Sequence, residues 1–203
     1  MASYSIIWDL ETVVDCEAFR RMESQLELSD EEAREQHGDR FAKLPLHQIV
    51  CIGAFEHFGH ERYDAFFDMA YHALPDDGAM LLHTICGITQ NDAARLGIPL
   101  TLRVARFVKF IMTEIFPGGR LPTVSMVETH ASNAGFQVSR VQSLQAHYAK
   151  TLDQWAAALE AHRADAIAVQ SQEVYDRYMK YLTGCADLFR GGYLDVNQFT
   201  LEK

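Results

Sequence analysis

The sequence lacks the features that mark a membrane-spanning protein, a secreted disulfide scaffold or a zinc protein. No stretch approaches the ~20 consecutive apolar residues that a bilayer-spanning helix needs, so any membrane contact is expected to be peripheral. Four cysteines are present without a C-x-x-C pair, namely Cys16, Cys51, Cys86 and Cys185. Single, widely spaced cysteines favour a reduced, cytoplasmic location over a disulfide framework or a zinc site.

Positive charge is also scarce. The chain has 18 Lys and Arg against 28 Asp and Glu, which gives a formal net charge of −10 at pH 7. Proteins that wrap nucleic acid neutralise its phosphates with clustered Lys and Arg, and no nucleic-acid partner is therefore expected. Residues 1–47 hold 11 Asp and Glu against 5 Lys and Arg, a difference of −6, so the first quarter differs in character from the rest.

The composition that is present is that of a globular α/β protein. The 203 residues are 48% hydrophobic and 23% charged, which suits one domain with a substantial core. Short apolar runs alternate with amphipathic stretches, and this alternation indicates strands alternating with helices. The expected strands are residues 4–11, 47–54, 79–85, 136–141 and 193–201, and the expected helices are residues 16–38, 55–74, 103–116, 126–134, 151–169 and 171–190.

Two helix starts and one strand direction follow from local signals. Thr151-Leu-Asp-Gln154 has the spacing of a capping box and predicts a helix start at Thr151, and Ser171 is predicted to cap the next helix. Gly191 and Gly192 are expected to end that helix. The alternating tail after them predicts a last strand antiparallel to the strand at residues 136–141.

Several blocks of sequence resemble one enzyme family. Residues 52–67 (IGAFEHFGHERYDAFF) are similar to the signature stretch of mycolic acid cyclopropane synthases and related mycolate methyltransferases. Further blocks look like that family in order and spacing, at residues 81–84, 110–122, 140–152, 178–185 and 195–199. The resemblance covers about 155 residues and sets the expected domain division, with residues 47–203 as the C-terminal part of the methyltransferase domain and residues 1–46 as a separate segment.

The resemblance implies a Rossmann-like, three-layer α/β/α fold and an S-adenosylmethionine (SAM)-dependent reaction. Members of the family transfer the SAM methyl group to a cis double bond of a long acyl chain, after which loss of a proton closes a cyclopropane ring. Relatives give methoxy or hydroxy products instead, and the base is taken to be a bound bicarbonate. The implied partner is a long-chain acyl lipid or an acyl chain on an acyl carrier protein.

The resemblance also implies the site. By position, Glu56, His83 and Tyr148 match the side chains that hold the bicarbonate, and the backbone at Ile52 matches a further contact. Imidazole and phenol groups can donate hydrogen bonds to an anion, and a carboxylate can accept the bicarbonate hydroxyl proton. Two further matches lie near the acyl site, Tyr181 and Cys185.

Each of these residues also has a structural interpretation. Glu56 follows a strand, and His83 within an apolar strand is typical of a neutral core histidine. The types and spacing of Tyr148, Tyr181 and Cys185 suit the core equally well. His57 and His60, three apart, could be drawn as a metal site, but zinc needs three or four converging ligands, and exposed helix surface is the favoured interpretation.

The first part of the chain does not follow the family. A SAM site of this class needs a glycine-rich turn after its first strand, whereas the first glycine is Gly38 and no Gly-x-Gly turn precedes Gly53. The usual cofactor-binding strands are therefore expected to be missing, and activity to be weak or nil.

Residues 5–13, followed by residues 41–54, instead resemble the start of predicted 3′–5′ exonucleases related to the proofreading domain of family B DNA polymerases. In that family an Asp-x-Glu pair, here Asp9 and Glu11, binds metal ions. No later exonuclease block follows. A chimera is therefore expected, and two alternatives stay open: a truncated exonuclease relative, and an inactive fragment that binds acyl chains or a partner.

Overall fold

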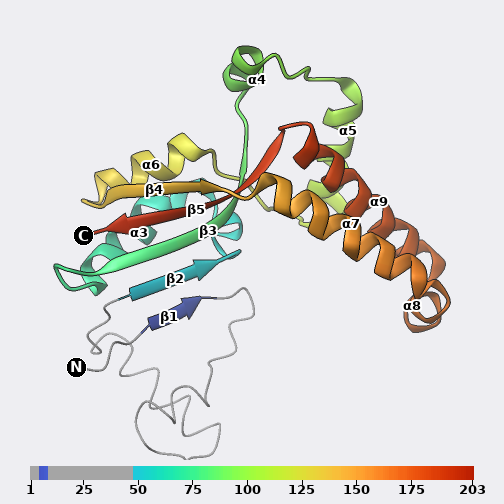
Figure 1. Cartoon of the computed structure of the whole chain (residues 1–203), viewed down its shortest axis with the longest axis horizontal. Helices are drawn as coiled ribbons and strands as arrows, with labels where there is room; N and C mark the ends of the chain where they lie inside the picture. The colour runs from blue at the N-terminus through green and yellow to red at the C-terminus, as the bar shows by residue number, and fades with distance from the viewer. Residues whose placement is uncertain (1–4, 9–47) are drawn as a thin grey trace, which may run out of the picture.

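The computed structural model describes residues 5–8 and 48–203, and its centre is one five-stranded sheet (Figure 1). The strands are β1 (Ser5–Trp8), β2 (Gln48–Ile52), β3 (Ala79–Gly87), β4 (Gln137–Ser143) and β5 (Leu194–Glu202). Their order across the sheet is β1-β2-β3-β5-β4. The first three are parallel, and β5 runs antiparallel to both β3 and β4. The predicted antiparallel last strand is confirmed.

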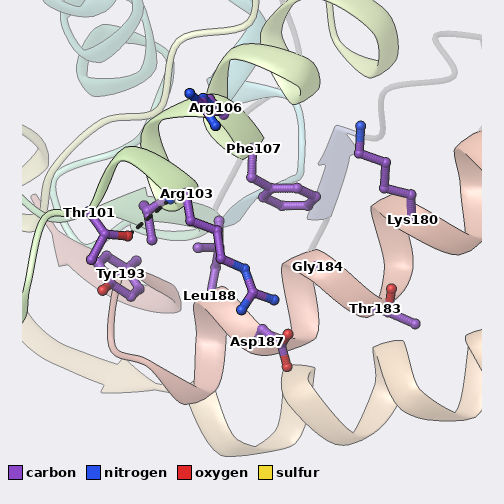
Figure 2. A pocket seen from close by; sticks show the side chains of 11 residues that line it. Thr101, Arg103, Arg106, Phe107, Lys180, Thr183, Gly184, Asp187, Leu188 and Tyr193 are labelled. Carbon is purple, nitrogen blue, oxygen red and sulfur yellow. Dashed lines mark hydrogen bonds between the residues drawn. The ribbon is translucent and has the colours of Figure 1, made fainter.

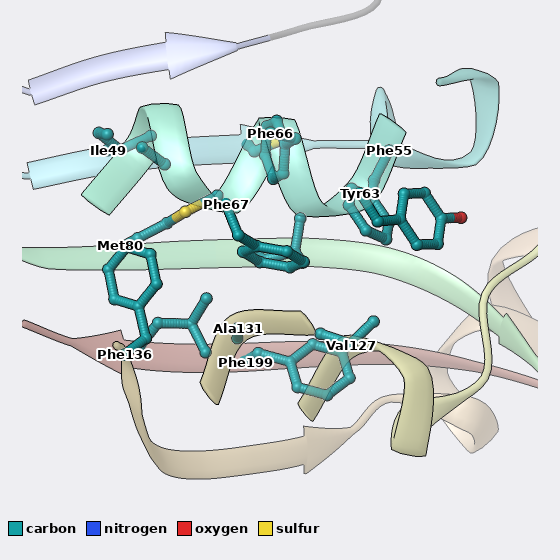
Figure 3. Close-up of a cluster of buried hydrophobic side chains, with 14 of the residues drawn as sticks. Ile49, Phe55, Tyr63, Phe66, Phe67, Met80, Val127, Ala131, Phe136 and Phe199 are labelled. Atoms are coloured by element: carbon teal, nitrogen blue, oxygen red, sulfur yellow. The ribbon is translucent and has the colours of Figure 1, made fainter. Parts of the chain in front are cut away.

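A first core fills the space between one face of the sheet and two helices, α3 (Tyr63–Ala73) and α6 (Val124–Asn133). Every second residue of β3 is buried, including Met80 and Leu82, which face this core. The core is rich in aromatic rings (Figure 3), among them Phe55, Phe66, Phe67, Phe136 and Phe199. Full burial of each such side chain contributes ~1.5–3 kcal/mol, which makes this core the main stabilising unit of the sheet.

A second core lies on the other face, at the carboxyl end of β3. It is formed by α7 (Gln145–Ala161) and α9 (Gln172–Arg190), which pack on Val196 of β5 and Ile85 of β3. The short helix α8 (Arg163–Val169) joins α7 to α9. Ile85 alternates along β3 with the residues of the first core, so its side chain points to the opposite face of the sheet. Helices therefore cover both faces, as expected for a three-layer fold.

The start of α7 corrects one prediction. Thr151 does not cap a helix; it lies inside α7, where its hydroxyl donates to the carbonyl oxygen of His147 at 3.1 Å. The helix begins at Gln145 without a side-chain cap, because the backbone N–H of Leu144 is held by the carbonyl oxygen of Val196 at 2.8 Å. Contact with β5 therefore sets this helix start. Ser171 caps α9 as predicted, by accepting the N–H of Val174 at 3.1 Å.

Between β3 and α6 the chain forms helices that stand beyond the sheet (Figure 1). The helix α4 (Gln90–Leu96) has a capping box between Thr89 and Asp92, and sequence reasoning missed it. The helix α5 (Leu102–Phe110) continues into a π-helical turn, Ile111–Ile115. Together, α5 and the π-helical turn span the region predicted to be one helix at residues 103–116.

The expected helix at residues 16–38 and the residues Asp9 and Glu11 lie outside the part of the chain that the structure describes. Within the described residues, no helix combines the length and the apolar character needed to cross a bilayer.

Candidate active site

The candidate site lies at the carboxyl ends of β2 and β3. After β2, Gly53 adopts a φ of 65°, a left-handed conformation that glycine tolerates best, and its N–H is held by the carbonyl oxygen of His83 at 3.0 Å. This turn leads into a 3₁₀ helix, Phe55–His57, that carries Glu56. The carboxyl edge of parallel strands is where α/β proteins bind their ligands.

Glu56 is a buried carboxylate, with only 6% of its surface exposed. Its Oε1 atom accepts the backbone N–H of Ile85 at 2.5 Å, and its carbonyl oxygen accepts the N–H of Arg120 at 3.1 Å. Its Oε2 atom is buried and has no hydrogen-bond partner among the described residues. Such an atom is costly to bury, so Glu56 presents an unused acceptor.

His83 connects three elements. Its Nε2 atom lies 2.8 Å from the hydroxyl oxygen of Tyr148 on α7, and its Nδ1 atom lies 3.2 Å from the amide nitrogen of Gln198 on β5. The backbone register places Ile52 beside His83 across the β2–β3 pair, and the Ile52 side chain is 40% exposed. The fold therefore brings Glu56, His83, Tyr148 and Ile52 to one edge of the sheet.

Burial keeps the His83 and Tyr148 side chains neutral. It lowers the pKa of His83, although the negative charge of Glu56 acts in the opposite direction. Burial and the same carboxylate raise the pKa of Tyr148. At neutral pH the pair is thus an imidazole and a phenol beside a carboxylate, a set that offers both hydrogen-bond donors and an acceptor.

The two residues expected at the acyl site lie on α9, next to the second core. The Tyr181 ring meets the Phe116 ring edge-on, with centroids 5.7 Å apart. Cys185 is buried, and desolvation raises the pKa of its thiol, like that of the Tyr181 hydroxyl, to about 12. Both groups remain protonated, so they offer apolar, polarisable surface rather than a nucleophile.

Two neighbours of the site were missed from the sequence. Gln198 is one polar residue in an alternating strand, and its contact with His83 depends on a strand register that spacing alone does not give. Phe116 follows the π-helical turn, whose extra residue shifts it relative to a regular helix. A π-helical turn often marks a functional site, but it leaves no local sequence signal.

A metal site at His57 and His60 is not supported. The Nε2 atom of His60 lies 3.1 Å from the carbonyl oxygen of Leu121, and the His57 ring packs edge-on against Phe116. The described residues contain no group of three or more His, Cys, Asp or Glu side chains placed to hold an ion.

A separate cavity of about 720 Å³ lies between α5 and α9 (Figure 2). Its walls include Arg103, Arg106, Phe107 and Lys180, and none of Glu56, His83 and Tyr148 lines it. Gly184 lets the Phe107 ring pack closely against α9, because a side chain at Gly184 would overlap that ring. Arg103 and Arg106 bring positive charge from α5 to this cavity.

The sheet order and the site at its edge define the class of protein, a SAM-dependent methyltransferase fold. A phosphoethanolamine N-methyltransferase 2 of Haemonchus contortus, solved in complex with S-adenosyl-L-methionine, shares the fold at a TM-score of 0.62 and 16% identity, over 78% of this chain and 33% of that one. The sequence profile described as "Mycolic acid cyclopropane synthetase" matches residues 12–199. The chain belongs to the mycolic acid cyclopropane synthetase family.

Individual relatives agree with this assignment. Cyclopropane mycolic acid synthase 1 of Mycobacterium tuberculosis is 65% identical over 159 residues, which are 78% of this chain and 55% of the relative. The solved cyclopropane synthase MmaA2 from Mycobacterium tuberculosis is 61% identical with a TM-score of 0.78, over 81% of this chain and 57% of that one. A structure of CmaA1 complexed with SAH and CTAB is 65% identical, with a TM-score of 0.74, over 78% of this chain and 56% of that one.

The chain spans about half the length of the curated relatives it matches. The family resemblance predicted for residues 47–203 is confirmed. Three other interpretations stay predictions: the exonuclease resemblance of residues 1–54, the domain division and the chimera.

Proposed function

We propose that the chain takes part in SAM-dependent methyl transfer to the double bond of a long-chain, mycolic-type acyl lipid, with formation of a cyclopropane. The observation that carries this proposal is the buried Glu56 carboxylate with its unpartnered Oε2 atom, beside the hydrogen-bonded pair of His83 and Tyr148. Relatives at 59–65% identity are named for cyclopropane and methoxy mycolic acid synthesis.

In this proposal, the side chains at this edge of the sheet hold a bicarbonate ion. Bicarbonate has one hydroxyl group to donate and charged oxygens to accept, and a site that holds it needs both an acceptor and donors. Glu56 Oε2 would accept the hydroxyl hydrogen, and the Tyr148 hydroxyl and the backbone at Ile52 would face the charged oxygens. In this proposal Glu56, His83 and Tyr148 orient the base that removes a proton when the ring closes.

SAM, when bound, supplies an electrophilic methyl group on a sulfonium. The chain's own contribution is to exclude water and to hold the acyl chain, for which Tyr181, Cys185 and Phe116 offer an apolar wall. The acyl chain would arrive on a lipid or on an acyl carrier protein. The related CmaA1 was solved in complex with SAH and CTAB, a detergent with a long alkyl chain.

Binding and transfer need separate experiments. Isothermal titration calorimetry with SAM and with its demethylated product SAH tests the cofactor, and incorporation of labelled methyl groups into lipids with a cis double bond tests the reaction. Because no Gly-x-Gly turn precedes Gly53, we expect weak cofactor binding and slow transfer. Saturable SAH binding with label in a cyclopropane product supports the proposal, whereas acyl-chain binding without either would assign the chain to lipid binding alone.

A further inference from the structure

Gln198 is held against His83 by the backbone of the sheet. The two residues face each other directly in the antiparallel β3–β5 register. Directly opposed side chains on one face of a sheet lie close together, and here the Gln198 amide nitrogen is 3.2 Å from Nδ1 of His83. Because β5 is hydrogen-bonded on both sides, Gln198 has little freedom to move away.

The orientation of the Gln198 amide determines where the protons lie. An amide NH₂ group only donates, so with the Gln198 nitrogen facing the ring, Nδ1 of His83 accepts. A neutral imidazole carries one donor and one acceptor, and the proton therefore sits on Nε2 and is donated to the Tyr148 oxygen, 2.8 Å away. The Tyr148 hydroxyl keeps its own hydrogen free for a third group.

We infer that Gln198 is a positioning residue that fixes the Nε2–H tautomer of His83 and thereby turns the Tyr148 hydroxyl hydrogen toward an anion beside Glu56. This role rests on the proposed function, because the anion is the bicarbonate of that proposal. The negative charge of Glu56 acts on both rings. A hydroxyl hydrogen aimed at an anion near this carboxylate offsets part of the repulsion between the two negative charges.

Without Gln198 the proton arrangement can reverse. If Nδ1 carries the hydrogen, Nε2 accepts from the Tyr148 hydroxyl. The Tyr148 oxygen then turns lone pairs toward the anion, which repels it. A neutral residue that never touches the anion would in this way decide whether the site attracts or repels it.

Nitrogen-15 NMR of the histidine rings tests the tautomer without any need for catalysis. The full chain is labelled with ring-¹⁵N histidine, and the His83 signals are assigned as those missing from His83→Gln. We expect the Nε2–H tautomer in the parent chain at neutral pH, and a shift toward Nδ1–H in Gln198→Met and in Gln198→Glu, whose carboxylate accepts from Nδ1–H. Gln137→Met, an exposed glutamine on β4, is the matched control and should leave the signals unchanged.

Two results would overturn the inference: an Nδ1–H tautomer in the parent chain, or an unchanged Nε2–H tautomer in both Gln198 variants. The first needs no variant, so a misfolded Gln198 protein does not remove the test. If labelled methyl transfer is detected, the bicarbonate concentration for half-maximal rate should rise about 10- to 100-fold in Gln198→Met, as for other residues that orient a ligand through a second side chain. An absence of methyl transfer would count against the proposed function and leave the tautomer result standing.

Discussion

The two oxygens of Glu56 have different surroundings. One accepts a backbone N–H from β3, and the other is buried without a partner among the described residues. Leaving a buried acceptor unpaired costs about 1–3 kcal/mol, and residues that lower stability in this way are typical of functional sites. The same atom can therefore be tested for its effect on stability and on activity.

Glu56→Gln should separate the two effects. The amide oxygen keeps the bond from Ile85, and because a buried charge is removed we expect the free energy of unfolding to rise by about 1 kcal/mol. Methyl transfer should fall about 100-fold, because the variant loses the charged acceptor that orients the base. Urea denaturation and labelled-methyl incorporation measure the two changes. Glu128→Gln on the exposed side of α6 is the control, and equal behaviour of the two variants would contradict a role for Glu56.

His83 should make stability depend on pH. Burial lowers its pKa below the ordinary 6.5, so as the pH falls through 6.5 the unfolded chain takes up a proton before the folded chain does. The contribution of neutral His83 is complete above 6.5 and is lost on acidification. The free energy of unfolding, measured in urea at about pH 7.5 and about pH 5.5, should drop more in the parent chain than in His83→Gln. His147→Gln, exposed on α7, should retain the parent slope.

The site residues differ in how far sequence could predict them. Glu56, His83 and Tyr148 come from three separate segments, and their proximity was implied by resemblance to a family, not by spacing. The structure brings them together through the turn at Gly53 and the contact of α7 with β5. Gln198 carried no signal because its role depends on which residue of β3 it faces.

At the scale of elements, the two predicted caps of α7 and α9 give a matched pair. Ser171 caps α9, and Ser171→Ala should cost about 1 kcal/mol because it leaves an N–H of the first turn unpaired. Thr151 lies within α7, so Thr151→Ala should change stability by less than about 0.5 kcal/mol, alanine being the better helix former. Thermal unfolding of both variants measures the difference. A larger loss for Thr151→Ala would mean that α7 starts where the sequence pattern placed it.

Gly135 and Gly97 both have positive φ angles, of 105° and 67°, but different surroundings. A Cβ at Gly135 would lie 2.9 Å from the Tyr71 ring, whereas a Cβ at Gly97 meets nothing within 4 Å. Gly97→Ala should therefore cost only the backbone term, about 1 kcal/mol. Gly135→Ala adds crowding and should cost about 3 kcal/mol. Urea midpoints that shift equally would show that Tyr71 can move aside freely.

The strands were predictable and one helix boundary was not. Apolar runs bounded by turn residues mark β2 and β3 in the sequence, because a buried strand needs such a run. The start of α7 depends on a backbone bond from Leu144 to β5, about fifty residues further along the chain. The helix therefore starts at Gln145, beside this contact, and not at the local capping pattern of Thr151.

At the scale of the whole molecule, β5 joins the parallel part of the sheet to β4. It pairs with β3 along its full length and with β4 along most of it, and its side chains enter both cores. Loss of one backbone donor in β5 should therefore weaken the entire fold. Loss of a donor in β4 should matter less, because β4 is a sheet edge and has a register shift at Ser139.

Proline substitutions test this difference. Thr200→Pro removes an N–H and crowds the strand between two neighbours, so it should cost about 3 kcal/mol or more. Ser139→Pro, at the irregular position of the edge strand, should cost much less, and Thr200→Val keeps the backbone donor as a control. Circular dichroism during thermal unfolding provides the measurement. Equal losses at the two proline sites would show that β5 is no more central to stability than β4.

The place of β5 also bears on how the chain folds as it leaves the ribosome. β5 follows every other described strand in the sequence, yet it lies between β3 and β4 in space. Until it emerges, β4 and one edge of β3 stay unpaired and both cores stay open to water, and such surfaces are prone to aggregation. The sheet therefore cannot close until β5 has emerged, and chaperones would be needed mainly in the interval before β5 emerges.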